Sequence, residues 1–214
     1  MKVRTQLTRY KEAAVTERPA LDALLDEILV AHVGFVSDGH PVVLPTAIAR
    51  DGDSVLIHGS TGSPWMQTLA RGVPASVAVT ALEGLVIARS AFASSVNYRS
   101  AVLFGEFRVV ADDPKESALI RLTDALLPGR SAEVRRSRPR ERAATMLLTM
   151  PISQWSMKVA DDWPEDDDDD IAGPAWAGVI PIRQAYLPPK PAPDLGTNRE
   201  VPPSVRALGE SSLI

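Results

Sequence analysis

The stretch over residues 88–105 reads ARSAFASSVNYRSAVLFG and decides how the rest of the chain is interpreted. It places arginine, asparagine, tyrosine and serine side chains between two apolar runs, residues 85–88 and 101–104, that favour strands. Guanidinium groups and hydroxyls at strand ends can bind a phosphate or a planar polar ring. The spacing fits equally well a β-hairpin whose connection is simply solvated.

Four shorter runs accompany this stretch: HVGFV at 32–36, PVVLPT at 41–46, LIHGS at 56–60 and WAGVIP at 176–181. Together they resemble the pyridoxamine 5'-phosphate oxidase-like flavoproteins, and more narrowly the bacterial flavin-nucleotide-binding branch to which the nitroimidazole reductases are related. The likeness covers roughly residues 20–185 in the right order, and the Asn97–Ser100 run is among its most specific parts. It implies a mainly β protein with flanking helices, an FMN-binding split β-barrel.

The composition suits one domain, because 214 residues of which 45% are hydrophobic can bury a sizeable core. We expect an N-terminal arm at 1–18, the flavin-binding barrel at 19–187 and a proline-rich extended tail at 188–214. The absence of cysteine excludes disulfides and thiolate metal sites. With no signal-like N-terminus and no long apolar run, we expect a cytoplasmic protein without membrane contact.

The net charge of −4 hides an uneven distribution of charge. Residues 161–170 carry eight acids and no base, and without them 23 basic residues face 19 acidic ones. Such a mildly basic body suits a small anionic ligand and gives no support to nucleic-acid binding. The acidic loop is most simply interpreted as a solvated surface loop. Six arginines lie between residues 130 and 142, and they form either a solvated helix face or a surface that binds the acidic loop of the same or another subunit.

Apolar periodicity and turn signals predict the elements. We expect helices at 19–30, 63–71 and 112–127, and a further helix over 133–150 that is broken near Pro139. Strands are expected at 32–36, 41–49, 54–58, 73–81, 85–90, 98–110, 152–159 and 179–185. Short connections between most of these strands indicate an antiparallel barrel.

The segment from His58 to Ser63 is a strand end, a small polar loop and a helix start, a geometry that can bind an anion. By itself the signal is weak, because many such turns bind nothing. In the resembling family the flavin phosphate lies here. Related sequences usually place Arg or Lys directly after the serine that matches Ser63, whereas this chain has Pro64. Backbone amides, the hydroxyls of Ser60, Thr61 and Ser63, and Arg89 or Arg99 are then the groups expected to meet the phosphate charge.

The resemblance implies FMN as cofactor and implies a set of contact residues for it. These are Pro45, Thr46, His58, Gly59, Ser60, Thr61, Ser63, Arg89, Asn97, Tyr98, Arg99 and Ser100. His58 is in addition the candidate proton donor to a substrate, because the family places an active-site histidine at the matching position and imidazole titrates in the useful range. A strand-end histidine bonded to backbone explains His58 equally simply. The three histidines lack metal-ligand spacing, so no metal site is predicted.

These features favour a flavin-dependent oxidoreductase that acts on a small molecule, with NAD(P)H as a possible electron donor. The family normally forms a homodimer with flavin at the subunit interface. Two alternatives stay open: a non-catalytic flavin-binding carrier, and a split barrel that uses F420 or haem. Related chains often carry histidines where this chain has Ala93 and Ser94, so no haem or catalytic role is transferred to those positions.

Overall fold

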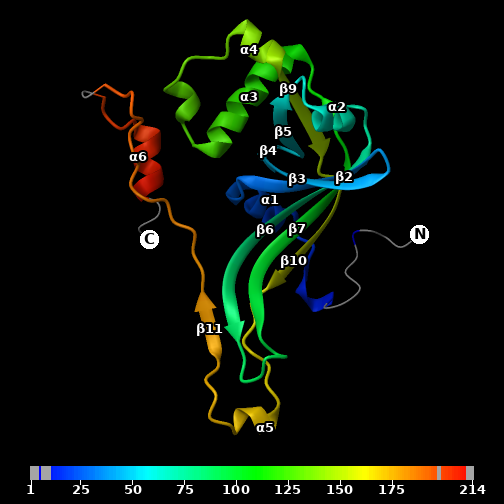
Figure 1. Cartoon of the computed structure of the whole chain (residues 1–214), viewed down its shortest axis with the longest axis vertical. Helices are drawn as coiled ribbons and strands as arrows, with labels where there is room; N and C mark the ends of the chain where they lie inside the picture. The colour runs from blue at the N-terminus through cyan, green and yellow to red at the C-terminus, as the bar shows by residue number, and fades with distance from the viewer. Residues whose placement is uncertain (1–4, 6–10, 197–198, 211–214) are drawn as a thin grey trace.

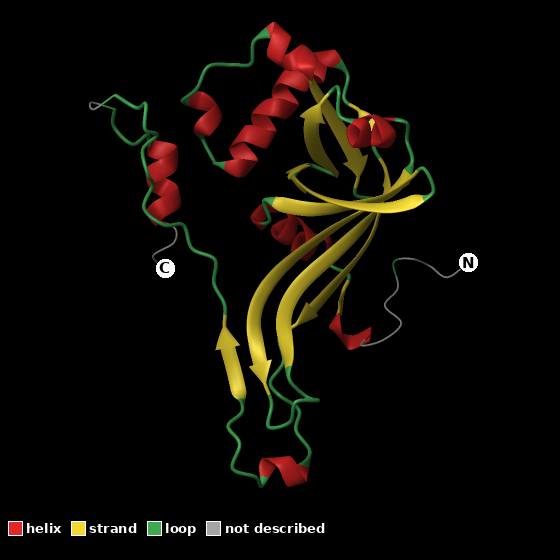
Figure 2. Cartoon of the chain, viewed as in Figure 1, coloured by secondary structure: helices red, strands yellow, loops and turns green. Residues whose placement is uncertain are grey.

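The computed structural model describes residues 5, 11–196 and 199–210. Two antiparallel sheets carry the fold (Figures 1 and 2). The larger sheet has the strand order β1-β10-β7-β6-β2-β3, with β11 also paired to β6, and the smaller has the order β4-β5-β9-β8. The fold class is therefore as predicted, mainly β with flanking helices.

The bounds of the strands are β1 Ala14–Val15, β2 Val30–Ser37, β3 His40–Ala47, β4 Ala49–Asp51, β5 Ser54–Ser60, β6 Pro74–Ile87, β7 Ser95–Glu106, β8 Arg108–Val109, β9 Thr145–Pro151, β10 Gln154–Ala160 and β11 Gly178–Pro181. The helices are α1 Arg18–Glu27, α2 Pro64–Ala70, α3 Asp112–Leu126, α4 Pro139–Ala144, α5 Asp168–Ile171 and α6 Pro203–Glu210, with short 3-10 turns η1 Lys11–Ala13 and η2 Arg130–Ala132. The helices expected at 19–30, 63–71 and 112–127 are present, the first one ending at Glu27.

The chain passes from one sheet to the other at three buried corners. Ile48 separates β3 from β4, Phe107 separates β7 from β8, and Ile152 lies between β9 and β10. These side chains are 1%, 0% and 5% exposed and belong to the main core. An apolar side chain at each corner lets the strand leave one sheet and join the other without exposing the space between them.

The prediction of a helix over residues 133–150 is wrong for the second half of that range. Residues 145–151 form β9, which is paired with β5 on one side and β8 on the other. Leu147 packs toward α3, whereas Leu148 and Met150 join the main core. A strand that is buried on both faces reads as a continuous apolar run, which periodicity alone cannot tell from a helix.

Two further predictions need correction. The segments 73–81 and 85–90 form one strand, β6, which continues through a bulge between Leu82 and Gly84. The tail beyond residue 188 is extended and irregular over much of its length, but it ends in the helix α6. Residues 1–4 and 6–10 of the N-terminal arm and 197–198 and 211–214 of the tail lie outside the described part of the chain.

An arm projects from the body. It consists of the far halves of β6 and β7 together with β10 and β11, and the acidic loop with α5 lies at its tip (Figure 1). At about 3.3 Å per strand residue, the run from the tip at Asn97 to the corner at Phe107 is roughly 33 Å long. Helices α3 and α4 lie at the opposite end of the molecule (Figure 2).

Phe107 is the largest fully buried side chain at a corner, so its truncation tests the importance of these crossings. We expect Phe107→Ala to lower the free energy of unfolding by about 3–5 kcal/mol, because it leaves a cavity where the strand changes sheets. Val109→Ala, two residues further and 56% exposed, serves as control and should cost about 1 kcal/mol or less. Urea titration measures both variants, and equal losses would show that the corner has no special role.

Candidate functional site

Two strand ends bring part of the predicted site together. β3, which carries Pro45 and Thr46, lies against β5, which carries His58. Leu56 and Ile57 are both buried, on opposite faces of β5, and His58 is exposed where the strand leaves the core, opposite Leu147 of β9. An exposed imidazole next to a strand end can meet a ligand without an opening of the core.

The backbone amides of the loop after β5 already donate hydrogen bonds within the chain. The Thr61 N–H donates to the Ala144 carbonyl at 3.0 Å, the Gly62 N–H to Ser60 Oγ at 3.2 Å, and the Ser63 N–H to the Ser60 carbonyl at 3.0 Å. Ser63 is the N-cap residue of α2, as predicted, although its side chain makes no capping hydrogen bond. The Thr61 hydroxyl also donates to the Ala144 carbonyl, at 3.3 Å. The loop therefore presents the hydroxyls of Ser60 and Ser63, rather than a set of unpaired amides, to an anion.

The Asn97–Ser100 run is divided between the two faces of the large sheet. Asn97 shares the inner face with buried Ala101, whereas Tyr98 and Ser100 belong to the outer face. Lys158 of β10 stands opposite Ser100, and its Nζ lies 5.6 Å from the centre of the Tyr98 ring. Only Tyr98 and Ser100 of this run therefore point to the open surface of the sheet.

Arg99 is committed to partners within the chain. Its Nε donates to Glu83 Oε1 at 2.7 Å, and its Nη2 donates to both carboxylate oxygens of Glu27 at 2.9 and 3.0 Å. Burial opposes the charge, but the hydrogen bonds to Glu27 and Glu83 outweigh it and raise the pKa of Arg99. Glu83 is the residue at the β6 bulge, so this irregularity aims a carboxylate at the guanidinium.

Arg89 and Asn97 anchor the acidic loop to the tip of the arm. The Arg89 N–H donates to Asp166 Oδ1 at 2.7 Å, and its Nη1 donates to Oδ2 at 2.9 Å. The Asp166 side chain is only 1% exposed. Asn97 donates to the Asp162 carbonyl at 3.0 Å and accepts from the Asp162 N–H at 3.1 Å. In the single chain these two residues are positioning groups for residues 161–170.

Sequence reasoning missed these carboxylate partners because they come from distant segments. Glu27 lies 72 positions from Arg99, and Asp166 lies 77 positions from Arg89. Of these carboxylates, only Glu83 could have been singled out from the sequence, because an isolated acid in an apolar strand next to a glycine suggests a bulge.

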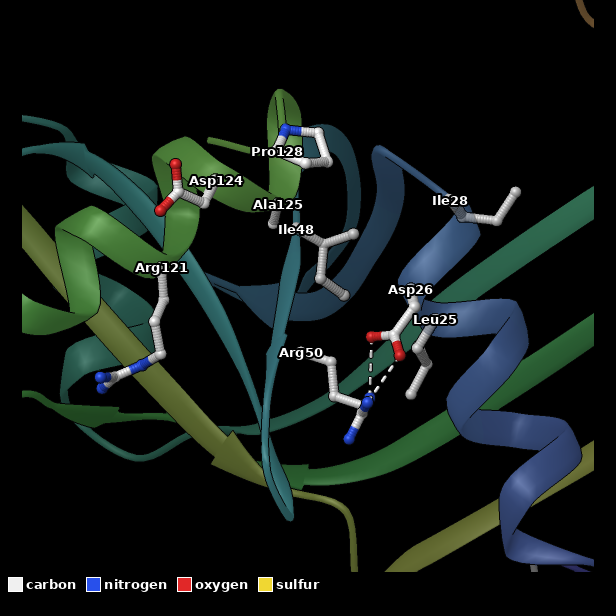
Figure 3. A pocket seen from close by; sticks show the side chains of 9 residues that line it. All are labelled: Leu25, Asp26, Ile28, Ile48, Arg50, Arg121, Asp124, Ala125 and Pro128. Atoms are coloured by element: carbon white, nitrogen blue, oxygen red, sulfur yellow. Dashed lines mark hydrogen bonds and ion pairs between the residues drawn. The ribbon is translucent and has the colours of Figure 1, made fainter. Parts of the chain in front are cut away.

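A cavity of about 330 Å³ lies elsewhere, between α1, β4 and α3 (Figure 3). Its cations are already matched: Arg50 donates to both carboxylate oxygens of Asp26 at 2.8 and 2.6 Å, and Arg121 pairs with Asp51 at 2.7 Å. The hydrogen bonds that Arg50 donates to Asp26 raise the pKa of Arg50 against the effect of burial. A charged ligand would have to break these pairs, so this cavity is not the candidate site.

The described residues contain neither a metal-binding cluster nor a membrane-spanning helix. Among the described residues no three His, Asp or Glu side chains gather in a way that could hold a metal ion. No helix in the described ranges is long and apolar enough to span a membrane.

The two sheets, joined at buried corners, define the class of split β-barrels. The family model described as pyridoxamine 5'-phosphate oxidase matches residues 17–159, and the chain belongs to this family. No curated protein matches the chain.

Solved structures place the chain within the family. It is 52% identical to the FAD and heme binding protein of Mycobacterium smegmatis, over 92% of this chain and 97% of that one, with a TM-score of 0.90. It is 36% identical to the flavocytochrome Anf3 of Azotobacter vinelandii, over 96% of both chains, with a TM-score of 0.90. A Bacteroides thetaiotaomicron protein assigned to 5-nitroimidazole antibiotic resistance shares the fold at 17% identity, covering 68% of this chain and 86% of that one, with a TM-score of 0.58.

The anchor of the acidic loop can be tested by hydrogen exchange. Arg89→Ala should make the amides of residues 170–173 exchange about tenfold faster or more, because Asp166 loses the charge-assisted bond from the guanidinium, worth about 1.5–3 kcal/mol. The bond from the backbone N–H of residue 89 to Asp166 remains in this variant. The melting temperature should change little, since the loop lies at the end of the arm. Arg108→Ala, in the exposed strand β8, is the matched control. Unchanged exchange in Arg89→Ala would show that the pair does not hold the loop.

Proposed function

We propose that the chain is a homodimeric oxidoreductase that binds a flavin and a haem and exchanges electrons with a small molecule. The observation that carries this proposal is the 52% identity, over nearly the whole chain, to a protein that binds FAD and heme. The similarity to a flavocytochrome at 36% identity supports it. When bound, a flavin transfers hydride or single electrons and a haem transfers single electrons.

The flavin we propose is FAD. The resemblance in sequence predicts FMN, and that prediction stays untested. FAD is favoured here because of the Mycobacterium smegmatis relative. Pro64 stands where a basic residue would otherwise meet a phosphate, and the amides at 61–63 are paired within the chain. The loop hydroxyls, Thr46 and His58 remain as the groups that fit a flavin here.

The residues present also fit a haem. The chain has no cysteine, and His32, His40 and His58 are its three histidines. His32 is exposed on the outer face of β2, opposite Pro45 and Ala78 in the sheet register. These short side chains, with Gly34 alongside, leave a flat surface that a porphyrin can cover. We therefore propose His32 to hold haem iron and His58 to act as the proton donor.

The outer face of the large sheet supports the homodimer. Val36, Val43 and Leu82 on this face are 59%, 64% and 45% exposed. A contiguous open groove of about 390 Å³ runs between β2, β3 and the near ends of β6 and β7. Exposed aliphatic side chains on a flat sheet indicate an interaction surface, and a second copy is the partner that the family resemblance implies.

The absorbance spectrum of protein purified from its host tests the cofactors directly. We expect a flavin spectrum together with a Soret band, and chromatography of the released flavin should show FAD. Released FMN would support the sequence prediction instead, and a deazaflavin spectrum would contradict the flavin proposal. A flavin that no reduced nicotinamide or other reductant changes would indicate the non-catalytic carrier.

Alanine variants at the three histidines separate their roles. His32→Ala should remove the Soret band while the flavin stays bound. His58→Ala should retain both spectra and lower turnover by about 10²–10⁴-fold, because a positioned proton donor contributes that much. His40→Ala, at the exposed start of β3, is the control and should change neither. Loss of the Soret band in His58→Ala would reverse the assignment, and full turnover in that folded variant would end the proton-donor proposal.

A further inference from the structure

We propose that the acidic tip of the arm docks on the arginine cluster of a second copy of the chain, in an antiparallel dimer. The acidic tip is residues 161–170 with the neighbouring turn of the arm, and the arginine cluster is Arg130, Arg135, Arg136, Arg138, Arg140 and Arg142. The proposal rests on the homodimer proposed above and assigns the segments that its two chains bring together.

The acidic tip carries charge that the chain itself does not neutralise. The described residues supply a salt-bridge partner to Asp166 alone among its eight acids. Asp167, Asp168 and Asp169 follow one another directly and are exposed. Like charges this close repel one another unless opposite charge comes near. The tip is held in place by Asp166 and Asn97, so the repulsion is not relieved by release of the loop.

The arginine cluster is the complementary surface. Arg130, Arg135 and Arg142 pair with Glu133, Glu141 and Glu116. Within the described ranges Arg136, Arg138 and Arg140 make no salt bridge, and all three are exposed. Hydrogen bonds from Arg135 and from the Arg138 N–H lower the pKa of Glu141 to about 2, so this carboxylate stays ionised and neutralises Arg135. The excess positive charge of the cluster comes from the three arginines without a salt bridge.

The two surfaces cannot meet within one chain. The acidic tip with α5 lies at one end of the long axis, and α4 with the arginine cluster lies at the other (Figure 1). A two-fold axis across the middle of the molecule would bring each tip to the partner's arginine cluster. Such an interface is self-complementary, so the same contact forms twice.

Apolar side chains around the tip point to a protein partner and not to counterions alone. Trp163 is 75% exposed, Trp176 65%, Ile171 53% and Phe92 fully exposed. Tryptophan is the side chain that most often anchors a protein interface once it is buried. Isolated ions would neutralise the carboxylates but would leave these rings in water.

The exposed segment that follows β11 also favours a second copy of the chain as the partner. It is fixed at one end by the Ile182 N–H, which donates to the Glu83 carbonyl at 2.8 Å, and at the other by the Ser204 N–H, which donates to Glu133 at 2.9 Å. Between these points Leu187 is 82% exposed and Leu195 48% exposed. Ordering each residue of such a segment costs about 1–2 kcal/mol, and burial against a second copy would offset it.

Charge reversal with rescue tests the docking. Asp168→Lys with Asp169→Lys should raise the dissociation constant of the dimer about tenfold or more, and Arg136→Glu with Arg140→Glu should do the same. The four substitutions together should restore dimerisation, because the charges are exchanged between surfaces that touch. Sedimentation velocity over a dilution series measures all three, and in about 1 M NaCl, where the Debye length falls to about 3 Å, the single-surface variants should approach the wild type.

The control reverses two exposed acids elsewhere, Glu12→Lys with Glu17→Lys, which changes net charge as much as the tip variant does. It should leave the dissociation constant unchanged. A wild-type chain that is monomeric would overturn the homodimer itself. A dimer that neither single-surface variant weakens, or that the combined variant fails to restore, would overturn the docking while the homodimer stands.

Discussion

The three buried corners at Ile48, Phe107 and Ile152 constrain the rest of the structure. At each of them one stretch of chain serves both sheets, so the sheets cannot move apart without exposing core side chains. The first corner brings the end of β3 against β5, so the strands that carry Thr46 and His58 are neighbours. The second lets β7 continue away from the body as the arm. Site and arm are thus both consequences of where the strands change sheets.

Much of this fold could be predicted from the sequence because local signals and tertiary packing agree there. The proline at the start of α2, the turn signals at 37–40 and 50–53, and the apolar stripe of α3 all lead to the observed elements. The failure at β9 has a physical cause. Its two faces are buried against different clusters, so its sequence has no polar face from which a period could be read.

The candidate site could be predicted in part. The sequence placed polar groups at strand ends, and the structure brings Thr46 and His58 to neighbouring strands. It could not show that Arg99 and Arg89 are neutralised by carboxylates more than 70 positions away. A guanidinium that is paired and half-buried is a costly ligand for a phosphate, because the pair must first be broken. Residues of such a motif can stabilise the fold as readily as they can bind a ligand.

These observations change what the specific run at 97–100 means for function. Its inner-face members fix the arm: Asn97 binds the acidic loop, and Arg99 ties β7 to the end of α1. Its outer-face members, Tyr98 and Ser100, lie on the same surface as His32. A flat ligand on that surface needs a rigid sheet beneath it and a cover above it. The inner-face ion pairs stiffen the sheet, and in the proposed homodimer a second chain would cover the exposed aliphatic side chains of the outer face. In that dimer a single copy would supply one wall of the site, and inner-face residues that do not touch the ligand would set the position of that wall.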